Sequence, residues 1–293
     1  MRPRIIVRYF NPPKSTIWSR LARALTRSIE RHCDGWDLDM QEIATLPLSS
    51  PLGVQGNVAN THKLDAWADA VQSSADGDRL LLLDADTLIR RPIDDVWESA
   101  FDLAYTVKKK GARFPFNGGV VFLRVSPQVR AFVGRWRAEN RRMLDDPIHH
   151  QVWRPAFGGI NQAALGMLLK LGGHGLEVCR LPCLEWNCED ESWDSFDPVR
   201  TRIVHYKSAL QRVTLRQHAT EQVPSVLVQE WRAMEEDDTR IAPRVKNMQV
   251  TEADLETPEQ LQVDGGEFPL MTRGGRRRHR QRGGVNDGPG TSV

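Results

Sequence analysis

The sequence contains little of what marks secreted, membrane-spanning or disulfide-stapled proteins. Only 4 of its 293 residues are cysteine, too few for a disulfide scaffold in a chain of this length, which favours a reducing, cytoplasmic setting. No uninterrupted apolar run exceeds that from Leu80 to Leu83, whereas a membrane-spanning helix needs about 20 such residues. Arg8 interrupts the apolar segment near the start, where a secretory signal would need a longer one. We therefore expect a globular protein with no membrane span.

A strong excess of one charge is absent as well. The chain has 40 Lys and Arg residues against 38 Asp and Glu residues. Six of those arginines lie after residue 272 with one aspartate, so the preceding part carries 34 basic and 37 acidic residues. Nucleic-acid-binding domains usually have a basic surplus of their own, which this part lacks. The run 273–282 has two interpretations, a cationic arm that holds nucleic acid through its phosphates or a solvated terminus without a partner.

Predicted strands and helices alternate along most of the chain. Short β-branched and apolar runs predict strands at 4–10, 37–43, 79–83, 102–107, 119–124, 176–181 and 202–206. Apolar residues at helical spacing predict helices from about residue 15 and at 61–74, 127–143 and 160–171, while prolines and glycines predict a loop at 46–58. This alternation is typical of an α/β domain with a mainly parallel mixed sheet.

The apolar pattern fades from about residue 235. We expect one α/β domain over residues 1–240, an acidic and polar extension over 241–271, and a Gly/Arg-rich tail over 272–293. The tail has too few apolar residues to offset the entropy that it would lose on ordering, so the sequence predicts that it is disordered.

Two carboxylates stand where the most apolar predicted strand ends. Asp84 and Asp86 follow the four leucines of residues 80–83, and ligands of open α/β sheets gather at the carboxyl ends of strands. Two aspartates at this spacing can converge on one cation, and oxygen ligands suit Mg²⁺ or Mn²⁺, which commonly bridge substrate phosphates. The segment therefore predicts a metal site that anchors phosphate.

This segment has two other interpretations. The aspartates could merely cap a turn or the start of a helix, as most Asp-x-Asp pairs do. A phosphatase of the haloacid dehalogenase type also carries strand-Asp-x-Asp, but that family expects a threonine four residues after the first aspartate. Here Thr87 stands three residues after Asp84, and some 80 residues precede the motif. Both interpretations fit the sequence less well than the metal site.

The sequence resembles the glycogenin and bacterial lipopolysaccharide galactosyltransferase group of GT-A glycosyltransferases. Five segments match in the family's order, and they are residues 61–67 (THKLDAW), 83–88 (LDADTL) with 92–97 (PIDDVW), 116–121 (FNGGVV), 161–165 (NQAAL) and 204–207 (VHYK). The resemblance covers roughly residues 4–212. It implies a Rossmann-like GT-A domain and a hexosyltransferase that uses Mn²⁺ (or Mg²⁺) and a nucleotide-diphosphate sugar of the UDP type, with retention of the anomeric configuration.

The resemblance also implies roles for individual residues. The metal ligands would be Asp84, Asp86 and His205. The donor-binding residues would be Lys63, Asn117, Gly118, Gly119, Asn187, Lys207 and Arg212. The catalytic residues would be Gln162 and Asn161 together with Asp86.

The sequence departs from the family in two places. Asn161 stands where the family has an aspartate, and an amide can bind sugar hydroxyls but cannot act as a base. The family's glycine and lysine after the histidine are missing at their usual spacing, so Lys207 or Arg212 would take over the contact with diphosphate. Asn161 leaves open a catalytically silent protein that binds sugar nucleotides or nucleic acid. The run 273–282 leaves open a transferase that modifies DNA or RNA, and the sequence does not identify the acceptor.

Three cysteines near one histidine raise the question of a zinc site. Cys179, Cys183 and Cys188 follow His174, but they lack the paired C-x₂-C spacing of common structural zinc sites. We expect free thiols at these positions.

Overall fold

The structure is a computed structural model of the chain. It describes residues 2–11, 16–43, 52–189, 193, 195–207, 211 and 223–236. Arg212, the predicted extension at 241–271 and the predicted tail at 272–293, with its basic run 273–282, lie outside the described residues.

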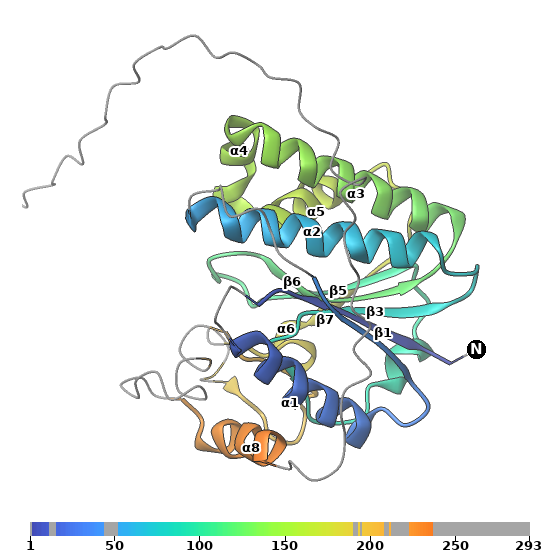
Figure 1. Cartoon of the computed structure of the whole chain (residues 1–293). Coiled ribbons are helices and arrows are strands. Elements are labelled where there is room, and N and C mark those ends of the chain that lie inside the picture. Colours follow the sequence, from blue (N-terminus) through green and yellow to red (C-terminus); the bar gives the residue numbers. More distant parts are fainter. Residues whose placement is uncertain are drawn as a thin grey trace, which may run out of the picture. The chain divides into compact units, whose positions relative to one another are not determined.

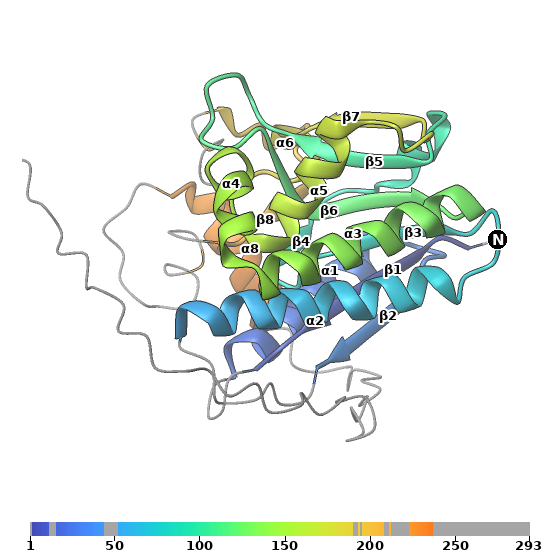
Figure 2. The ribbon, with the colours of Figure 1, turned by 90° about the horizontal axis from the view of Figure 1, so that it is seen from above.

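A six-stranded mixed sheet forms the centre of the domain (Figures 1 and 2). In spatial order its strands are β2 (Asp37–Glu42), β1 (Arg4–Tyr9), β3 (Arg79–Leu83), β6 (Phe116–Arg124), β5 (Leu103–Val107) and β7 (Val178–Pro182). The pairs β1–β2, β1–β3 and β5–β7 are parallel, and β6 runs antiparallel to both β3 and β5. The mostly parallel mixed sheet that the sequence predicts is confirmed. A small second sheet joins β4 (Thr87–Ile89) to β8 (Ile203–His205).

Helices cover both faces of the large sheet (Figure 1). One face carries α2 (Leu52–Gln72), α3 (Pro127–Asp145), α4 (Pro147–Phe157) and α5 (Ile160–Leu171). The other carries α1 (Ile17–His32), the short α6 (Cys183–Trp186) and α8 (Ser225–Glu236). A 3₁₀ turn, Asp94–Glu98, follows β4. Among the described residues, no helix combines the length and the apolar character needed to span a membrane.

The two-sided burial of the sheet explains the leucine run in β3. Leu80 and Leu82 belong to the hydrophobic cluster under α2 and α3, whereas Leu81 and Leu83 belong to the cluster on the α1 face. All four are at most 1% exposed, and burying each side chain contributes about 1.5–3 kcal/mol. The strand is thereby held rigidly up to the residue before Asp84.

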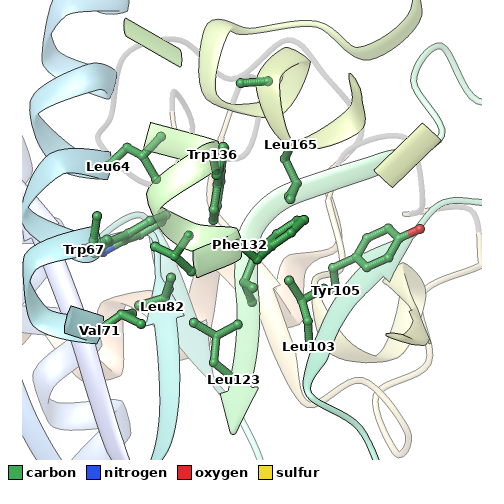
Figure 3. Packing of buried hydrophobic residues seen from close by; sticks show 14 of the residues in the cluster. Leu64, Trp67, Val71, Leu82, Leu103, Tyr105, Leu123, Phe132, Trp136 and Leu165 are labelled. Carbon is green, nitrogen blue, oxygen red and sulfur yellow. The ribbon is translucent and has the colours of Figure 1, made fainter. Parts of the chain in front are cut away.

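Large aromatic side chains fill the space between the sheet and its upper helices. Trp67 of α2 and Trp136 of α3 lie with ring centroids 6.5 Å apart, and Figure 3 shows them above Leu82 and Leu123 of the sheet. Trp67 faces inward with Leu64 and Val71 because residues three and four apart share one face of a helix. This packing fixes the helix that also carries Lys63.

Two sequence predictions are wrong in their boundaries. The loop predicted at 46–58 is helical from Leu52 onward, since α2 includes the two glycines that favour a turn there. Strand β6 begins at Phe116 rather than at residue 119, which places Asn117 and Gly118 within the sheet. Helices α4 and α8 were not predicted, and α4 begins behind Asp146, whose side chain accepts from the backbone N–H of Ile148 and His149.

Candidate functional site

The predicted metal ligands meet at the carboxyl end of β3. His205 Nε2 lies 3.0 Å from Asp86 Oδ1 and 3.9 Å from Asp84 Oδ2. One ligand atom from each residue lies within 4.8 Å of those of the other two. The pairing of β4 with β8 sets Thr87 opposite His205, and the Tyr206 N–H donates to the Asp86 carbonyl oxygen at 2.5 Å. The small sheet therefore carries the histidine back to the aspartates.

Asp86 and His205 form a buried hydrogen-bonded pair. Their exposed fractions are 8% and 4%. Burial raises the pKa of Asp86, but the charge of His205 and its hydrogen bond outweigh burial and hold that pKa below its usual value. Burial likewise lowers the pKa of His205, and Asp86 outweighs it, so the imidazole pKa is raised. The pocket thus favours a positive charge between the carboxylates.

Asn187 orients the imidazole. Its Oδ1 atom lies 3.1 Å from His205 Nδ1, and the residue is fully buried. A hydrogen bond from Nδ1 to this oxygen leaves Nε2 directed at the two carboxylates. Metal-binding histidines are commonly held by such a second partner, and the donor set of two carboxylates and one oriented imidazole fits a divalent cation.

Gly119 of β6 makes room for these side chains. A Cβ atom at this position would lie 2.7 Å from Asp84 Oδ2 and 2.7 Å from His205 Cε1, closer than real contacts allow. The pairing of β6 with β5 is irregular here, since Tyr105 pairs with Val121 whereas the next residue, Thr106, pairs with Asn117. Such bulges are common beside functional sites, and this one brings glycine backbone against the carboxylate.

Lys63 connects α2 to the site. Its Nζ atom lies 2.5 Å from Asp84 Oδ1 and 4.7 Å from the centroid of the Trp67 ring. The two oxygens of Asp84 thus face different partners, Lys63 on one side and His205 on the other. The ammonium group lies where it can also meet an anion bound beside the aspartates.

A buried polar network supports the site from behind. Asn117 Nδ2 donates to Glu189 Oε2 at 2.7 Å, while its Oδ1 accepts from the Gly119 N–H at 2.8 Å. Thr106 Oγ1 donates to the Asn117 carbonyl oxygen and accepts from Asn187 Nδ2, both at 3.0 Å. Asn117 therefore connects the bulge at Gly119 to residues on two other elements.

Glu189 is a residue that the sequence analysis missed. It is fully buried, and its carboxylate contacts the ammonium groups of Lys108 and Lys207. Burial raises the pKa of Glu189, but the two lysines outweigh burial and lower that pKa below its usual value. Lys207, predicted to bind the donor, is thus anchored by Glu189. No motif marks this glutamate, because its partners come from distant parts of the chain.

Two cavities flank Lys63 and Asp84. The first, of about 410 Å³, extends from Asp84 and Asp86 to the aromatic residues Tyr9, Phe10 and Trp18. The second, of about 130 Å³, is shared by Lys63, Asp84 and the following residues of β6 and α5: Gly118, Gly119, Asn161 and Gln162. The site therefore offers a larger space with aromatic walls and a smaller polar one.

The two candidate catalytic amides lie at the start of α5 and border the smaller cavity. Gln162 Oε1 accepts from the Gly118 N–H at 3.2 Å, and its Nε2 donates to the Phe157 carbonyl oxygen. Asn161 Nδ2 donates to the Asn60 carbonyl oxygen at 2.8 Å. Asn161 Oδ1 is buried and has no hydrogen-bond partner among the described residues. An acceptor atom of this kind is available to a hydroxyl donor.

The cysteines are free thiols, and Cys183 and Cys188 are buried. Burial, the largest influence, raises the pKa of each of these two thiols to about 12. Within the described part of the chain, Asp84, Asp86 and His205 form the one group of three or more residues suited to hold a metal ion. The cysteines near His174 do not form such a group there.

No protein-family model and no curated protein matches the sequence of this chain. Among solved structures, an active-site Gln-to-Glu mutant of LgtC, a galactosyltransferase, is similar over 82% of this chain and 97% of that chain, with a TM-score of 0.52 and 13% identity. The glycosyltransferase GlyE of Streptococcus pneumoniae TIGR4 is similar over 78% of this chain, with a TM-score of 0.51 and 16% identity. The matched region spans 62% of the GlyE chain.

These similarities show the fold. The chain has the GT-A fold of glycosyltransferases, as the resemblance in its motifs predicted.

Proposed function

We propose that this protein is a metal-dependent glycosyltransferase that moves a sugar from a nucleotide-diphosphate donor, a UDP-sugar, to an acceptor hydroxyl group. The observation that carries the proposal is the convergence of Asp84, Asp86 and His205 between two cavities at the carboxyl edge of a GT-A sheet. A diphosphate at this edge would have the nucleoside on one side and the sugar on the other.

Asp84, Asp86 and His205 would hold a divalent cation. The imidazole favours Mn²⁺ over Mg²⁺, which prefers oxygen ligands throughout. When bound, the cation would offset the negative charge that grows on the departing diphosphate. Asn187 would keep Nε2 of His205 directed at it through the hydrogen bond to Nδ1.

The larger cavity would take the nucleoside and the smaller one the sugar. Tyr9, Phe10 and Trp18 give the larger cavity the apolar walls that suit a base. Lys63, which borders both cavities, would meet the phosphates between them. Lys207 forms an ion pair with Glu189. Its ammonium group would also contact the diphosphate.

Gln162 and Asn161 would contact the sugar. Asn161 Oδ1, unpartnered in the described part of the chain, would accept from a sugar hydroxyl. The LgtC variant has glutamate in place of an active-site glutamine. A glutamine in the active site of that enzyme supports the same role for Gln162. The Gly118 N–H holds Gln162 Oε1, so the amide plane is fixed before the donor binds.

The arrangement favours a same-face reaction with retention. Among the described residues around the smaller cavity, Asp84 is the sole carboxylate, and Lys63 holds it, so no enzymatic nucleophile is offered. The acceptor oxygen would form its bond to the anomeric carbon as the bond from that carbon to the diphosphate breaks. The acceptor proton would pass to an oxygen of the departing diphosphate, which leaves on the same face.

The first test is calorimetric titration of UDP with and without Mn²⁺. Wild-type protein should bind UDP at least tenfold more tightly with Mn²⁺, and Asp86→Ala should lose that difference. Asp95→Ala, in the 3₁₀ turn outside both cavities, is the matched control and should retain it. Equal, metal-independent binding by wild type and Asp86→Ala would refute the proposal.

A catalytically silent sugar-nucleotide binding protein is the second candidate, and Asn161 favours it because an amide replaces the family's carboxylate. Incubation with a panel of UDP-sugars separates the two. Release of UDP by wild type, abolished in Asp84→Ala, supports the enzyme. UDP binding without release, with release gained in Asn161→Asp, supports the silent protein.

A further inference from the structure

A third cavity lies on the same face of the sheet and has no role in the proposed donor site. This groove, of about 840 Å³, lies between α5, the end of α4 and the strands β5 and β7. The rings of Tyr105, Phe116 and Phe157 form its apolar part, and the side chains of Lys170, His174 and Arg180 supply its polar part. Figure 3 shows the Tyr105 hydroxyl directed away from the packed cluster that the ring borders.

The groove begins close to the proposed sugar position. Helix α5 borders the smaller cavity with Gln162 and the groove with Leu169, and these seven residues correspond to about 10 Å along a helix. Strand β6 makes the same connection, since Phe116 lines the groove and Gly118 lines the smaller cavity. An acceptor lying in the groove could therefore reach the reacting carbon.

The surroundings of the groove are cationic. Lys170 and Arg180 are exposed, and neither forms an ion pair within the described part of the chain. The same holds for Lys109, Lys110 and Arg113 in the connection between β5 and β6.

That connection lies beside the reaction centre. The ring of Phe114 is so close to Gly158 that a Cβ atom there would lie 3.1 Å from it, and Gly159 lines the smaller cavity. No acidic residue lines the groove among the described residues. Lys170 and Arg180 thus line the groove without a carboxylate among its described lining residues, and such cations favour an anionic ligand.

The apolar part of the groove favours an aliphatic body over a nucleic-acid base. Tyr105, Phe116 and Phe157 are 7%, 3% and 8% exposed, so their ring faces are covered. Single-stranded nucleic acid binds by stacking bases on open ring faces. Small aliphatic side chains complete the walls, and a flexible hydrocarbon can fill the space between them.

We propose that this groove binds the acceptor, and that the acceptor is an aliphatic amphiphile that carries a phosphate group and a separate hydroxyl group that takes the sugar. Its hydrocarbon lies against the partly exposed side chains of Val107, Leu169 and Val178, and its phosphate meets the cations at the rim. The role as acceptor rests on the proposed function, whereas the class of ligand rests on the groove alone.

The binding test uses geranyl phosphate, geraniol and inorganic phosphate as calorimetric probes of the full chain. Geranyl phosphate should bind at least tenfold more tightly than either of the others. Lys170→Glu with Arg180→Glu should weaken geranyl phosphate at least tenfold and leave geraniol within twofold. Arg23→Glu with Arg31→Glu, on exposed positions of α1 across the sheet, is the matched control and should change nothing.

A filling variant tests the apolar part. Ala156 is exposed and lines the groove, so Ala156→Trp should obstruct it without disturbing the core and should weaken binding of both geranyl probes at least tenfold. Equal binding of geraniol and geranyl phosphate, or binding that ignores both variants, overturns the proposal. So does a single-stranded oligonucleotide that binds more tightly than geranyl phosphate and is lost in the same variants.

Two further measurements separate the groove from the donor site. The groove variants should retain Mn²⁺-dependent UDP binding. If the wild-type protein itself shows no Mn²⁺-dependent UDP binding, the donor site is refuted and the groove is not. Saturating geranyl phosphate should change the rate of UDP release from the donor at least threefold in wild type and leave it unchanged in Ala156→Trp. An unchanged rate in wild type would place the groove outside the reaction and overturn its role as acceptor site.

Discussion

Gly119 and Asp84 approach each other as closely as their atoms allow. The Asp84 N–H donates to the Gly119 carbonyl oxygen at 2.9 Å, and a Cβ on Gly119 would lie 2.7 Å from Asp84 Oδ2. His205 Cε1 occupies the same space at 2.7 Å. The absence of a side chain at this position therefore determines whether the two candidate metal ligands can stand together.

A methyl group at position 119 should disrupt the metal site. Gly119→Ala must displace Asp84 or His205, and overpacking of this kind costs about 1–3 kcal/mol. We expect the affinity for Mn²⁺ to fall at least tenfold by calorimetry. Gly118→Ala is the matched control, because a Cβ there meets nothing within 4 Å. Equal Mn²⁺ affinities in the two variants would contradict this account of Gly119.

The hydrogen bond between Asn187 and His205 should affect the affinity for Mn²⁺, which can be measured without a catalysed reaction. Asn187→Leu removes the acceptor for Nδ1, and losing such a partner typically lowers metal affinity about 10–100-fold. Asn187→Asp retains an acceptor at the same distance and should restore most of the Mn²⁺ affinity. A purely structural role for Asn187 would leave the two variants indistinguishable in Mn²⁺ titrations.

Glu189 should stabilise the fold in a pH-dependent manner. Its pKa in the folded state is lowered by Lys207 and Lys108 against the opposing effect of burial. Its contribution to the free energy of unfolding is therefore complete above the unfolded pKa of about 4.3 and is lost as the pH falls through the lower, folded pKa.

Glu189→Gln removes the buried carboxylate that Lys108 and Lys207 contact, which costs about 3–5 kcal/mol. Urea unfolding should show this loss at pH 7 and a smaller difference from wild type near pH 3. Glu177→Gln, on an exposed loop, should unfold like wild type at both pH values. A difference between wild type and Glu189→Gln that does not vary with pH would refute the charged pairing.

The cysteines should be unreactive in the folded protein. Burial raises the pKa of Cys33, Cys183 and Cys188 to about 12, so these thiols stay protonated at pH 8. Iodoacetamide at pH 8 should modify only the half-buried Cys179 before unfolding and all four cysteines in urea, as measured by mass spectrometry. Rapid native labelling of Cys183 or Cys188 would contradict this expectation.

Features that depend on neighbouring residues could be predicted from the amino-acid sequence alone. The four leucines at 80–83 require burial on both faces of a strand, and the pattern places Asp84 and Asp86 where that strand leaves the sheet. Ser126 and Pro127 mark the start of α3, where the Ser126 side chain accepts from the Val129 N–H. The aspartates, the distant histidine and the order of five short motifs were enough to predict a GT-A fold.

Boundaries set by packing could not be found in this way. Gly53 and Gly56 are turn signals in isolation, yet they lie within α2. A single residue has only a weak preference for helix or turn, and its context overrides that preference. For the same reason, α4 and α8 escaped a prediction based on periodicity.

Which distant side chains meet depends on how the strands pair in the folded domain. Asp86 and His205 are 119 positions apart, and the antiparallel pairing of β4 with β8 brings them together. Glu189 meets Lys108 and Asn117 only because β5 and β6 lie side by side and the chain returns behind them. Local patterns encode which faces are buried, whereas the direction and partner of each strand depend on contacts across the whole sheet.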